Sequence, residues 1–248
     1  KSYLNQEKIL EVMLSSGTDA VHPGYGFLSE NDDFARLCEK NKINFIGPSA
    51  NSMNLCGDKM RCKEAMLKAK VPTVPGSPGL VNGADEAEKI ANGIGYPVML
   101  KSVYGGGGRG IRIVTTDQEL RDAYETVTAE SIAAVGKSAI IVEKFLEKTR
   151  HIEYQMCRDH HGNAVHLFER ECSIQRRNQK LIEQTPSPVV DETKRKEIGE
   201  LVVKAAEAVD YTNLGTAEFL RADNGEFYFI EINARLQVEH PISEMVSG

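Results

Sequence analysis

Apolar residues recur at helical spacing in some segments of the chain and at alternate positions in others. The helical spacing predicts helices at residues 6–15, 33–40, 84–92, 117–135 and 192–209. Alternating or β-branched runs predict strands at 43–46, 96–101, 111–116, 139–145, 151–159, 164–174, 216–222 and 226–233. The mixture indicates an α+β (mixed α/β) fold with most of its strands in the second half.

The order of these elements predicts four regions. Residues 1–46 are too short to close a doubly wound sheet, so we interpret them as the C-terminal half of an α/β domain. Residues 47–72 carry helical spacing and end at prolines, which is typical of a helical connector. Residues 73–145 form a small α/β unit, and residues 146–248 begin a larger, antiparallel β-rich domain.

The last two strands predict a hairpin with two facing carboxylates. Asn224-Gly225 is a favoured two-residue turn, and it places Glu218 directly opposite Glu231; a four-residue loop around the same pair gives the same register. Like charges in this position destabilise a sheet. A bridging cation removes the repulsion, and oxygen ligands with an added amide from Asn233 suit Mg²⁺ or Mn²⁺.

The segment FIEINARLQVEH continues this polar alternation, and we interpret it as one strand. Its polar positions are Glu231, Asn233, Arg235, Gln237 and Glu239. Such a face is either ordinary solvated sheet or a site in which Arg235 neutralises a small anion and Glu239 acts as a general base.

The stretch KSVYGGGGRGIR contains the spacing G-x-G-x-x-G, but a strand follows it rather than a helix. A dinucleotide-binding turn, and with it an NAD-dependent oxidoreductase, is therefore disfavoured. The pattern predicts a hairpin whose glycine loop either lies over phosphates, with Lys101 as a cation beside it, or is a plain surface turn.

A second basic group follows a predicted strand. Arg176, Arg177 and Lys180 lie within five residues of an otherwise acidic chain, which indicates either a solvated charge run or an oxyanion site around Lys180. Gln175 is a polar contact beside it, and His151 begins a strand whose alternate positions are polar.

Composition narrows the classes of function. The 248 residues are 41% hydrophobic, enough for a proper core, and the net charge of -6 argues against general affinity for nucleic acid. No apolar run approaches the roughly 20 residues of a membrane span. Five cysteines without Cys-x-x-Cys spacing favour a reducing compartment, so we expect a cytoplasmic protein, or a mitochondrial-matrix protein in a eukaryote.

Taken in order, several motifs closely resemble the biotin carboxylase family of ATP-grasp enzymes. They are HPGYGFLSEN, GDK, YPVMLKSVYGGGGRG, EKFLE, RHIEYQ, ERECSIQRRNQK and FIEINARLQVEHP. The resemblance covers essentially the whole chain. It implies an ATP-grasp fold with a small lid domain and a larger β-rich domain, preceded by the remnant of a pre-ATP-grasp domain.

The resemblance also implies roles for single residues. Contacts to ATP are implied for Lys59, Lys101, Gly105, Gly106, Gly107, Gly108, Glu143, Phe145, Leu146, His151 and Gln175. Magnesium ligands are implied at Glu218, Glu231 and Asn233. The resemblance further implies that Lys180, Arg235, Gln237 and the Val238 backbone bind bicarbonate and that Glu239 is the base.

The implied reaction uses MgATP to convert bicarbonate to carboxyphosphate, whose CO₂ is captured by biotin on a carrier protein. A carboxyltransferase component and a homodimer of the full-length chain are further implied. Asn178 replaces the family's usual histidine, and the family's greater length implies an internal fragment. Another ATP-grasp ligase that joins a carboxylate to an amine, or a non-catalytic ATP-binding module, remains an alternative.

Overall fold

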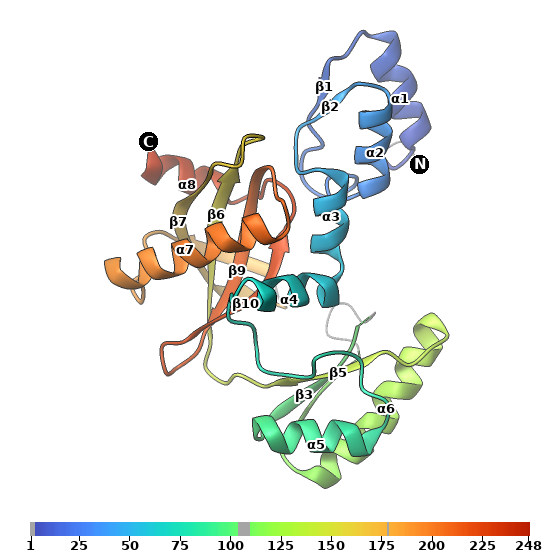
Figure 1. Cartoon of the computed structure of the whole chain (residues 1–248), viewed down its shortest axis with the longest axis vertical. Helices are drawn as coiled ribbons and strands as arrows, with labels where there is room; N and C mark the ends of the chain where they lie inside the picture. Colours follow the sequence, from blue (N-terminus) through green and yellow to red (C-terminus); the bar gives the residue numbers. More distant parts are fainter. Residues whose placement is uncertain (1–2, 104–109, 178) are drawn as a thin grey trace. The chain divides into compact units, whose positions relative to one another are not determined.

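The computed structural model describes residues 3–103, 110–177 and 179–248 (Figure 1). It divides into two compact units. Unit 1 comprises Lys1–Pro72, Arg150–Arg221 and Phe227–Gly248, and unit 2 comprises Thr73–Thr149 and Ala222–Glu226. Among the described residues, no helix combines the length and apolarity that crossing a bilayer requires.

Unit 1 begins with a small α/β segment. Helices α1 (Gln6–Ser15) and α2 (Asp32–Lys40) accompany the parallel pair β1 (Ala20–Val21) and β2 (Asn44–Phe45). The predicted connector is two helices, α3 (Ala50–Gly57) and α4 (Lys59–Lys68). They are separate because Asp58 ends α3 and accepts hydrogen bonds from the first N–H groups of α4, which fixes Lys59 at the start of that helix.

A five-stranded antiparallel sheet forms the rest of unit 1, in the order β10-β9-β6-β7-β8. The strands are β6 (Arg150–Arg158), β7 (Ala164–Arg176), β8 (Gln179–Gln184), β9 (Asn213–Arg221) and β10 (Phe227–Asn233). Helix α7 (Glu192–Ala208) packs on β6 and β7, and α8 (His240–Ser247) contacts β7. The sequence pattern missed β8 and α8.

The two faces of this sheet differ because side chains alternate along each strand. Ile152, Tyr154 and Phe219 are fully buried and belong to a core that includes Val202 of α7. The alternate positions carry polar side chains, and of these Glu153 and Gln155 are also fully buried. Burying a polar face requires hydrogen-bond partners for each of its groups, and those partners build the site described below.

The hairpin of β9 and β10 pairs Glu231 with Glu218, as predicted, but by a different route. Arg221 pairs with Phe227, so the predicted two-residue turn is wrong, and so is the four-residue loop. A register shift between Phe229 and Glu231 then takes up one residue and restores the expected pairing.

Unit 2 is a three-stranded antiparallel sheet in the order β4-β3-β5. Its strands are β3 (Val98–Ser102), β4 (Ile111–Val114) and β5 (Ile140–Lys144), and its helices are α5 (Ala84–Ile94) and α6 (Asp117–Val135). Both helices pack on the sheet around a separate apolar core. The antiparallel pairing of β3 with β4 confirms the hairpin interpretation of the glycine stretch.

Replacing Gly215 of β9 with alanine should destabilise unit 1. An added Cβ would clash with the hydroxyl oxygen of Tyr211, which is fully buried and cannot withdraw. Overpacking of this kind costs about 1–3 kcal/mol of unfolding free energy, measurable by urea denaturation. Gly57→Ala is the control, because its Cβ meets open space. Equal stability of the two variants would contradict this packing.

Candidate functional site

Three carboxylates face one another across neighbouring strands of unit 1. Glu231 of β10 pairs with Glu218 of β9, which pairs with Glu153 of β6, which in turn pairs with Arg170 of β7. This carboxylate row of Glu231, Glu218 and Glu153 spans three strands on the polar face of the sheet, and Arg170 on the fourth strand ends it. Three like charges on neighbouring strands would destabilise the sheet if no cations lay close to them.

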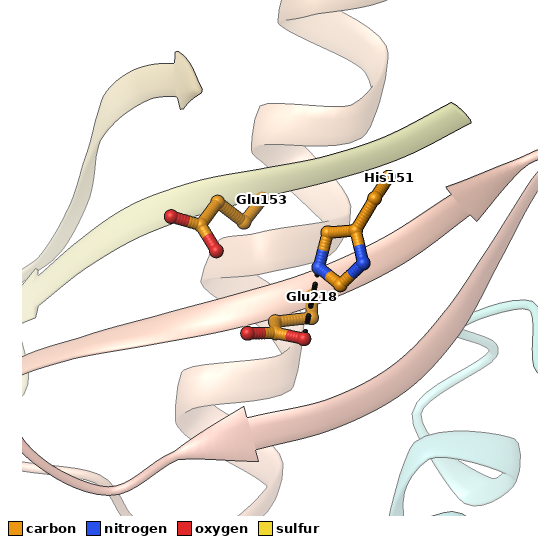
Figure 2. A group of neighbouring side chains, drawn as sticks. All are labelled: His151, Glu153 and Glu218. Atoms are coloured by element: carbon orange, nitrogen blue, oxygen red, sulfur yellow. Dashed lines mark ion pairs between the residues drawn. The ribbon is translucent and has the colours of Figure 1, made fainter. Parts of the chain in front are cut away.

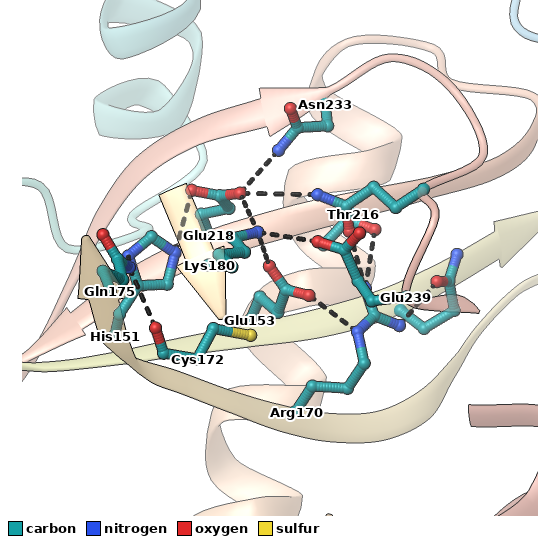
Figure 3. Close-up of polar contacts among 12 residues, drawn as sticks. His151, Glu153, Arg170, Cys172, Gln175, Lys180, Thr216, Glu218, Asn233 and Glu239 are labelled. Atoms are coloured by element: carbon teal, nitrogen blue, oxygen red, sulfur yellow. Dashed lines mark hydrogen bonds and ion pairs between the residues drawn. The ribbon is translucent and has the colours of Figure 1, made fainter. Parts of the chain in front are cut away.

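Lys180 of β8 supplies one such cation (Figure 3). Its Nζ donates hydrogen bonds to Glu153, to Glu218 Oε1 at 2.8 Å and to Glu239 Oε1 at 3.0 Å. The side chain is only 17% exposed. Burial alone would lower the pKa of Lys180, but the charges of Glu153 and Glu218 raise it above its usual value. The Lys180 amine is therefore protonated at neutral pH and is held among the three carboxylates that it contacts.

Glu218 is the most heavily contacted carboxylate of the row. His151 Nε2 lies 2.9 Å from Glu218 Oε2, and Asn233 Nδ2 donates to Oε1 at 2.7 Å (Figures 2 and 3). Burial would raise the pKa of Glu218, but the hydrogen bond from His151 and the charge of Lys180 outweigh it and lower the pKa to about 2. Glu218 is therefore ionised at neutral pH.

Glu231 has weaker compensation. Burial first, and then the charge of Glu218, raise the pKa of Glu231, while Lys59 Nζ lies 3.9 Å from Glu231 Oε2. A divalent cation between Glu218 and Glu231 would remove this repulsion, so the oxygen donors here fit Mg²⁺. In this structure the Asn233 amide turns its nitrogen, not its oxygen, toward Glu218, and its Oδ1 lies 3.3 Å from Arg235.

The polar alternation beyond Asn233 lies on a loop. Strand β10 ends at Asn233, so the prediction of one continuous strand through His240 is wrong. Arg235 donates to Glu30 Oε2 at 3.1 Å, while Glu239 turns to Lys180. The loop separates side chains that a strand would have kept in one line.

These residues nevertheless line one cavity of about 840 Å³ in unit 1. The predicted site residues on its wall are His151, Gln175, Lys180, Glu218, Glu231, Asn233, Arg235, Gln237, Val238 and Glu239. Gln175 and His151 also contact each other, with Gln175 Nε2 3.2 Å from His151 Nδ1. The cavity thus offers cations and amides beside carboxylates, a combination that holds a small anion next to a base.

Of the remaining predicted residues, Lys59 belongs to unit 1 but is not on this cavity wall, and the others belong to unit 2 or to undescribed positions. Lys101 of β3 donates to Glu143 Oε2 of β5 at 2.6 Å, while Phe145 and Leu146 follow β5 and are half-buried. Gly105, Gly106, Gly107, Gly108 and Asn178 lie outside the described residues.

Three acidic or basic residues of the site were not predicted. The sequence contained a signal that could have identified Glu153 as a site residue, because Glu153 shares the polar alternation of His151 on β6. The signal at Arg170 was misleading, because Glu-Arg-Glu in a strand suggests solvent exposure, whereas the Arg170 side chain is fully buried. Glu183 lies on β8, which the pattern did not identify.

Comparison with family models now places the chain. The model described as the carbamoyl-phosphate synthase L chain, ATP binding domain, matches residues 58–248, and the biotin carboxylase N-terminal domain matches residues 1–53. The chain belongs to the first of these families, that of the ATP-binding domain. Together the two models extend over nearly the whole chain, in agreement with the resemblance to biotin carboxylases.

Curated relatives confirm that resemblance. The 2-oxoglutarate carboxylase small subunit of Hydrogenobacter thermophilus is 51% identical over 247 residues, covering 100% of this chain and 52% of that protein. The biotin carboxylase of Nostoc sp. is 51% identical over 248 residues, covering 100% of this chain and 56% of that protein. The chain therefore spans about half the length of the relatives that it matches.

Solved structures confirm the ATP-grasp fold. A biotin carboxylase β-γ-ATP complex from Campylobacter jejuni has a TM-score of 0.90 at 49% identity, covering 99% of this chain and 55% of that one. The biotin carboxylase domain dimer of the Hydrogenobacter thermophilus 2-oxoglutarate carboxylase, with MgADP, ADP and bicarbonate, has a TM-score of 0.87 at 52% identity. It covers 98% of this chain and 54% of that one.

Glu183 gives this site a pH dependence that stability measurements can detect. Its Oε2 is buried and has no hydrogen-bond partner among the described residues. Burial first, and then the charges of Glu239 and Glu153, raise the pKa of Glu183 to about 7. The folded state therefore keeps a proton that an unfolded chain releases near pH 4.3, so stability falls as pH rises through this window.

Glu183→Gln should remove that loss. We expect the variant to gain on the order of 1 kcal/mol over the unsubstituted chain at pH 8, after solvent screening, and nothing at pH 4. Urea unfolding at both pH values measures the difference. Glu200→Gln, exposed on α7, is the control and should behave alike at both. A Glu183→Gln effect independent of pH would refute the prediction.

Proposed function

We propose that this chain is the ATP-binding and bicarbonate-activating part of a biotin carboxylase. The observation that carries the proposal is the Lys180 ammonium held among Glu153, Glu218 and Glu239 on the wall of the cavity. A fixed cation next to a carboxylate base is what deprotonation of a bound oxyanion requires. Relatives named as biotin carboxylases, about half identical over the whole chain, support the choice of reaction.

The chain's own residues perform the first chemical step. Lys180, Arg235, the Gln237 amide and the Val238 backbone bind bicarbonate, and Glu239 accepts its hydroxyl proton. The freed oxygen attacks the γ-phosphorus of ATP, and the bond to ADP breaks to give carboxyphosphate. Carboxyphosphate breaks down to phosphate and CO₂. The released phosphate takes the ureido N–H proton of biotin, and the nitrogen of the resulting enolate bonds to the carbon of CO₂ while Arg235 balances the charge of the enolate.

Glu218, Glu231 and Asn233 are the proposed magnesium ligands. The bound ion would supply charge neutralisation on the phosphates of ATP. Glu218 is ready for this task because it is ionised, and Glu231 becomes a better ligand once a cation offsets the charge of Glu218. His151 keeps Glu218 oriented from the side opposite Lys180.

The nucleotide contacts are proposed from the positions that match the family motifs. Lys59 and Lys101 bind phosphates, Gly105–Gly108 form the lid loop, and Glu143 holds the nucleotide at the hinge. Phe145 and Leu146 line the adenine pocket, and His151 and Gln175 contact the ribose-phosphate side. The contact between His151 and Gln175 supports a shared role for that pair.

The proposed partners follow from the reaction. They are a biotin carboxyl carrier protein or domain, a carboxyltransferase component and, in the full-length protein, a second copy of the chain. Relatives over this segment include a methylcrotonoyl-CoA carboxylase subunit and propionyl-CoA carboxylase chains. Different acceptor names on one shared segment support binding of the final acceptor by the carboxyltransferase component. A cytoplasmic or mitochondrial-matrix location, and the four-region division, belong to the same proposal.

The test is ADP release by the full-length protein that contains this segment. With MgATP, bicarbonate and free biotin, ADP should be released, and release should fall to background when bicarbonate is left out. Omitting biotin should lower the rate less, because carboxyphosphate forms before biotin is used. ATP cleavage that ignores bicarbonate would rule out this mechanism and favour a ligase with another carboxylate substrate.

Glu231→Gln should weaken Mg²⁺-dependent binding of the nucleotide. Loss of one anionic oxygen donor should raise the Mg²⁺ concentration for half-maximal nucleotide binding by about tenfold or more. Equilibrium binding of a fluorescent ATP analogue over a Mg²⁺ titration measures it. Asp223→Asn, exposed at the tip of the same hairpin, should leave the titration unchanged. An unaltered titration in Glu231→Gln would exclude that residue as a ligand.

A further inference from the structure

Arg170 occupies the centre of the site without reaching the cavity. It is fully buried, and the cavity wall does not include it. Its five N–H groups have five acceptors: Glu153 Oε1 at 2.6 Å, Gln155 Oε1 at 2.8 Å, Ser243 Oγ at 2.8 Å, Thr216 Oγ1 at 3.2 Å and Gln237 Oε1 at 2.6 Å. An arginine has five such donors, so the guanidinium is saturated.

The bond to Gln237 decides which end of that amide meets the cavity. Gln237 Oε1 is committed to Arg170, so its Nε2 is directed elsewhere, toward Glu218 Oε1 at 3.5 Å. The Gln237 side chain is buried and cannot turn freely. The amide therefore presents hydrogen-bond donors, which suit an oxyanion, and its acceptor oxygen is kept away.

The bond to Glu153 acts on Lys180 in the same way. Glu153 uses Oε1 for Arg170 and Oε2 for Lys180. When one oxygen of a carboxylate is held, the position of the other oxygen is fixed as well. Arg170 therefore determines where Glu153 Oε2 lies, and with it the position of Lys180. Two donors of the cavity, one amide and one ammonium, thus depend on a single guanidinium.

We propose that Arg170 is the positioning residue of the oxyanion pocket, where it orients the Gln237 amide directly and the Lys180 ammonium through Glu153. The inference rests on the proposed function, since it names bicarbonate as the planar anion that these donors bind. Because Arg170 is not on the cavity wall, we expect it to contact neither the anion nor the nucleotide. Its loss should therefore affect the binding of bicarbonate much more than that of MgATP.

The main variant is Arg170→Lys in the full-length protein. Lysine keeps the charge beside Glu153 but cannot reproduce the planar set of donors. We expect the KM for bicarbonate to rise about tenfold or more, while the KM for MgATP stays within about twofold. Steady-state ADP release measures both constants, and thermal unfolding measures the accompanying loss of stability.

Arg195→Lys is the matched control. Arg195 donates two hydrogen bonds to Glu169, the buried neighbour of Arg170 on β7, and contacts no residue of the cavity wall in the described bonds. It should lower the unfolding temperature without raising the KM for bicarbonate. Equal bicarbonate KM values in the two lysine variants would overturn the proposal, because stability alone would then explain the effect of Arg170.

A double-mutant cycle separates positioning from general damage. If Arg170 acts through Gln237, the bicarbonate KM of the double variant Arg170→Lys/Gln237→Ala should rise less than the product of the two single effects. Independent effects would multiply, and that result would count against the proposal.

If Arg170→Lys does not fold, the variant Gln237→Glu tests the proposal instead. It keeps an acceptor for Arg170 and should fold, yet it should raise the bicarbonate KM at least about tenfold; an unchanged KM would refute the proposal.

The unsubstituted protein reports separately on the proposed function. If it releases ADP without any need for bicarbonate, the function itself fails, whatever the variants do. If it depends on bicarbonate and the Arg170 variant binds bicarbonate normally, only the positioning role fails.

Discussion

The repulsion among Glu231, Glu218 and Glu153 is the constraint on which the arrangement of unit 1 depends. Three carboxylates on adjacent strands cannot lie on a buried face unless cations approach them closely. Arg170 ends the row within the sheet, and Lys180 reaches it from β8. The strand order therefore has a chemical reason as well as a topological one, because β7 and β8 deliver the compensating charges. The same charges suit the adjoining anion and metal sites that we propose in the cavity.

Stability and chemistry are divided between the two faces of the sheet. The apolar face packs with α7 into the core, which holds the strands in place whatever occupies the cavity. The polar face contributes less to stability for each buried group, because every buried charge there must first offset its lost hydration. Such a face gains orientation instead: where the hydrogen bonds are saturated, as at Arg170, the side chain keeps one arrangement, so little reorganisation is needed when a substrate arrives.

Much of this could be predicted from the sequence, for reasons that particular residues make clear. Helices such as Gln6–Ser15 carry a capping side chain and regular apolar spacing, so their bounds follow from local signals. Glu218 and Glu231 were paired correctly although the turn was wrong, because the bulge offset the error. Strand β8 was missed since its exposed Leu181 and Ile182 give no clear alternation of burial. Arg170 could not be identified either, because its burial depends on partners from four distant segments.

The bulge beside Ile230 links the tip of the hairpin to the end of β10 at which we propose metal binding. A shift of one residue in the pairing of β10 with β9 turns every following side chain of β10 to the opposite face. Tip and bulge are thus a compensating pair, because the shift between Phe229 and Glu231 offsets the pairing of Arg221 with Phe227. Without that shift Glu231 would lie opposite Ala217, on the other face of the sheet from Glu218, so the meeting of the two carboxylates depends on a local irregularity of the backbone.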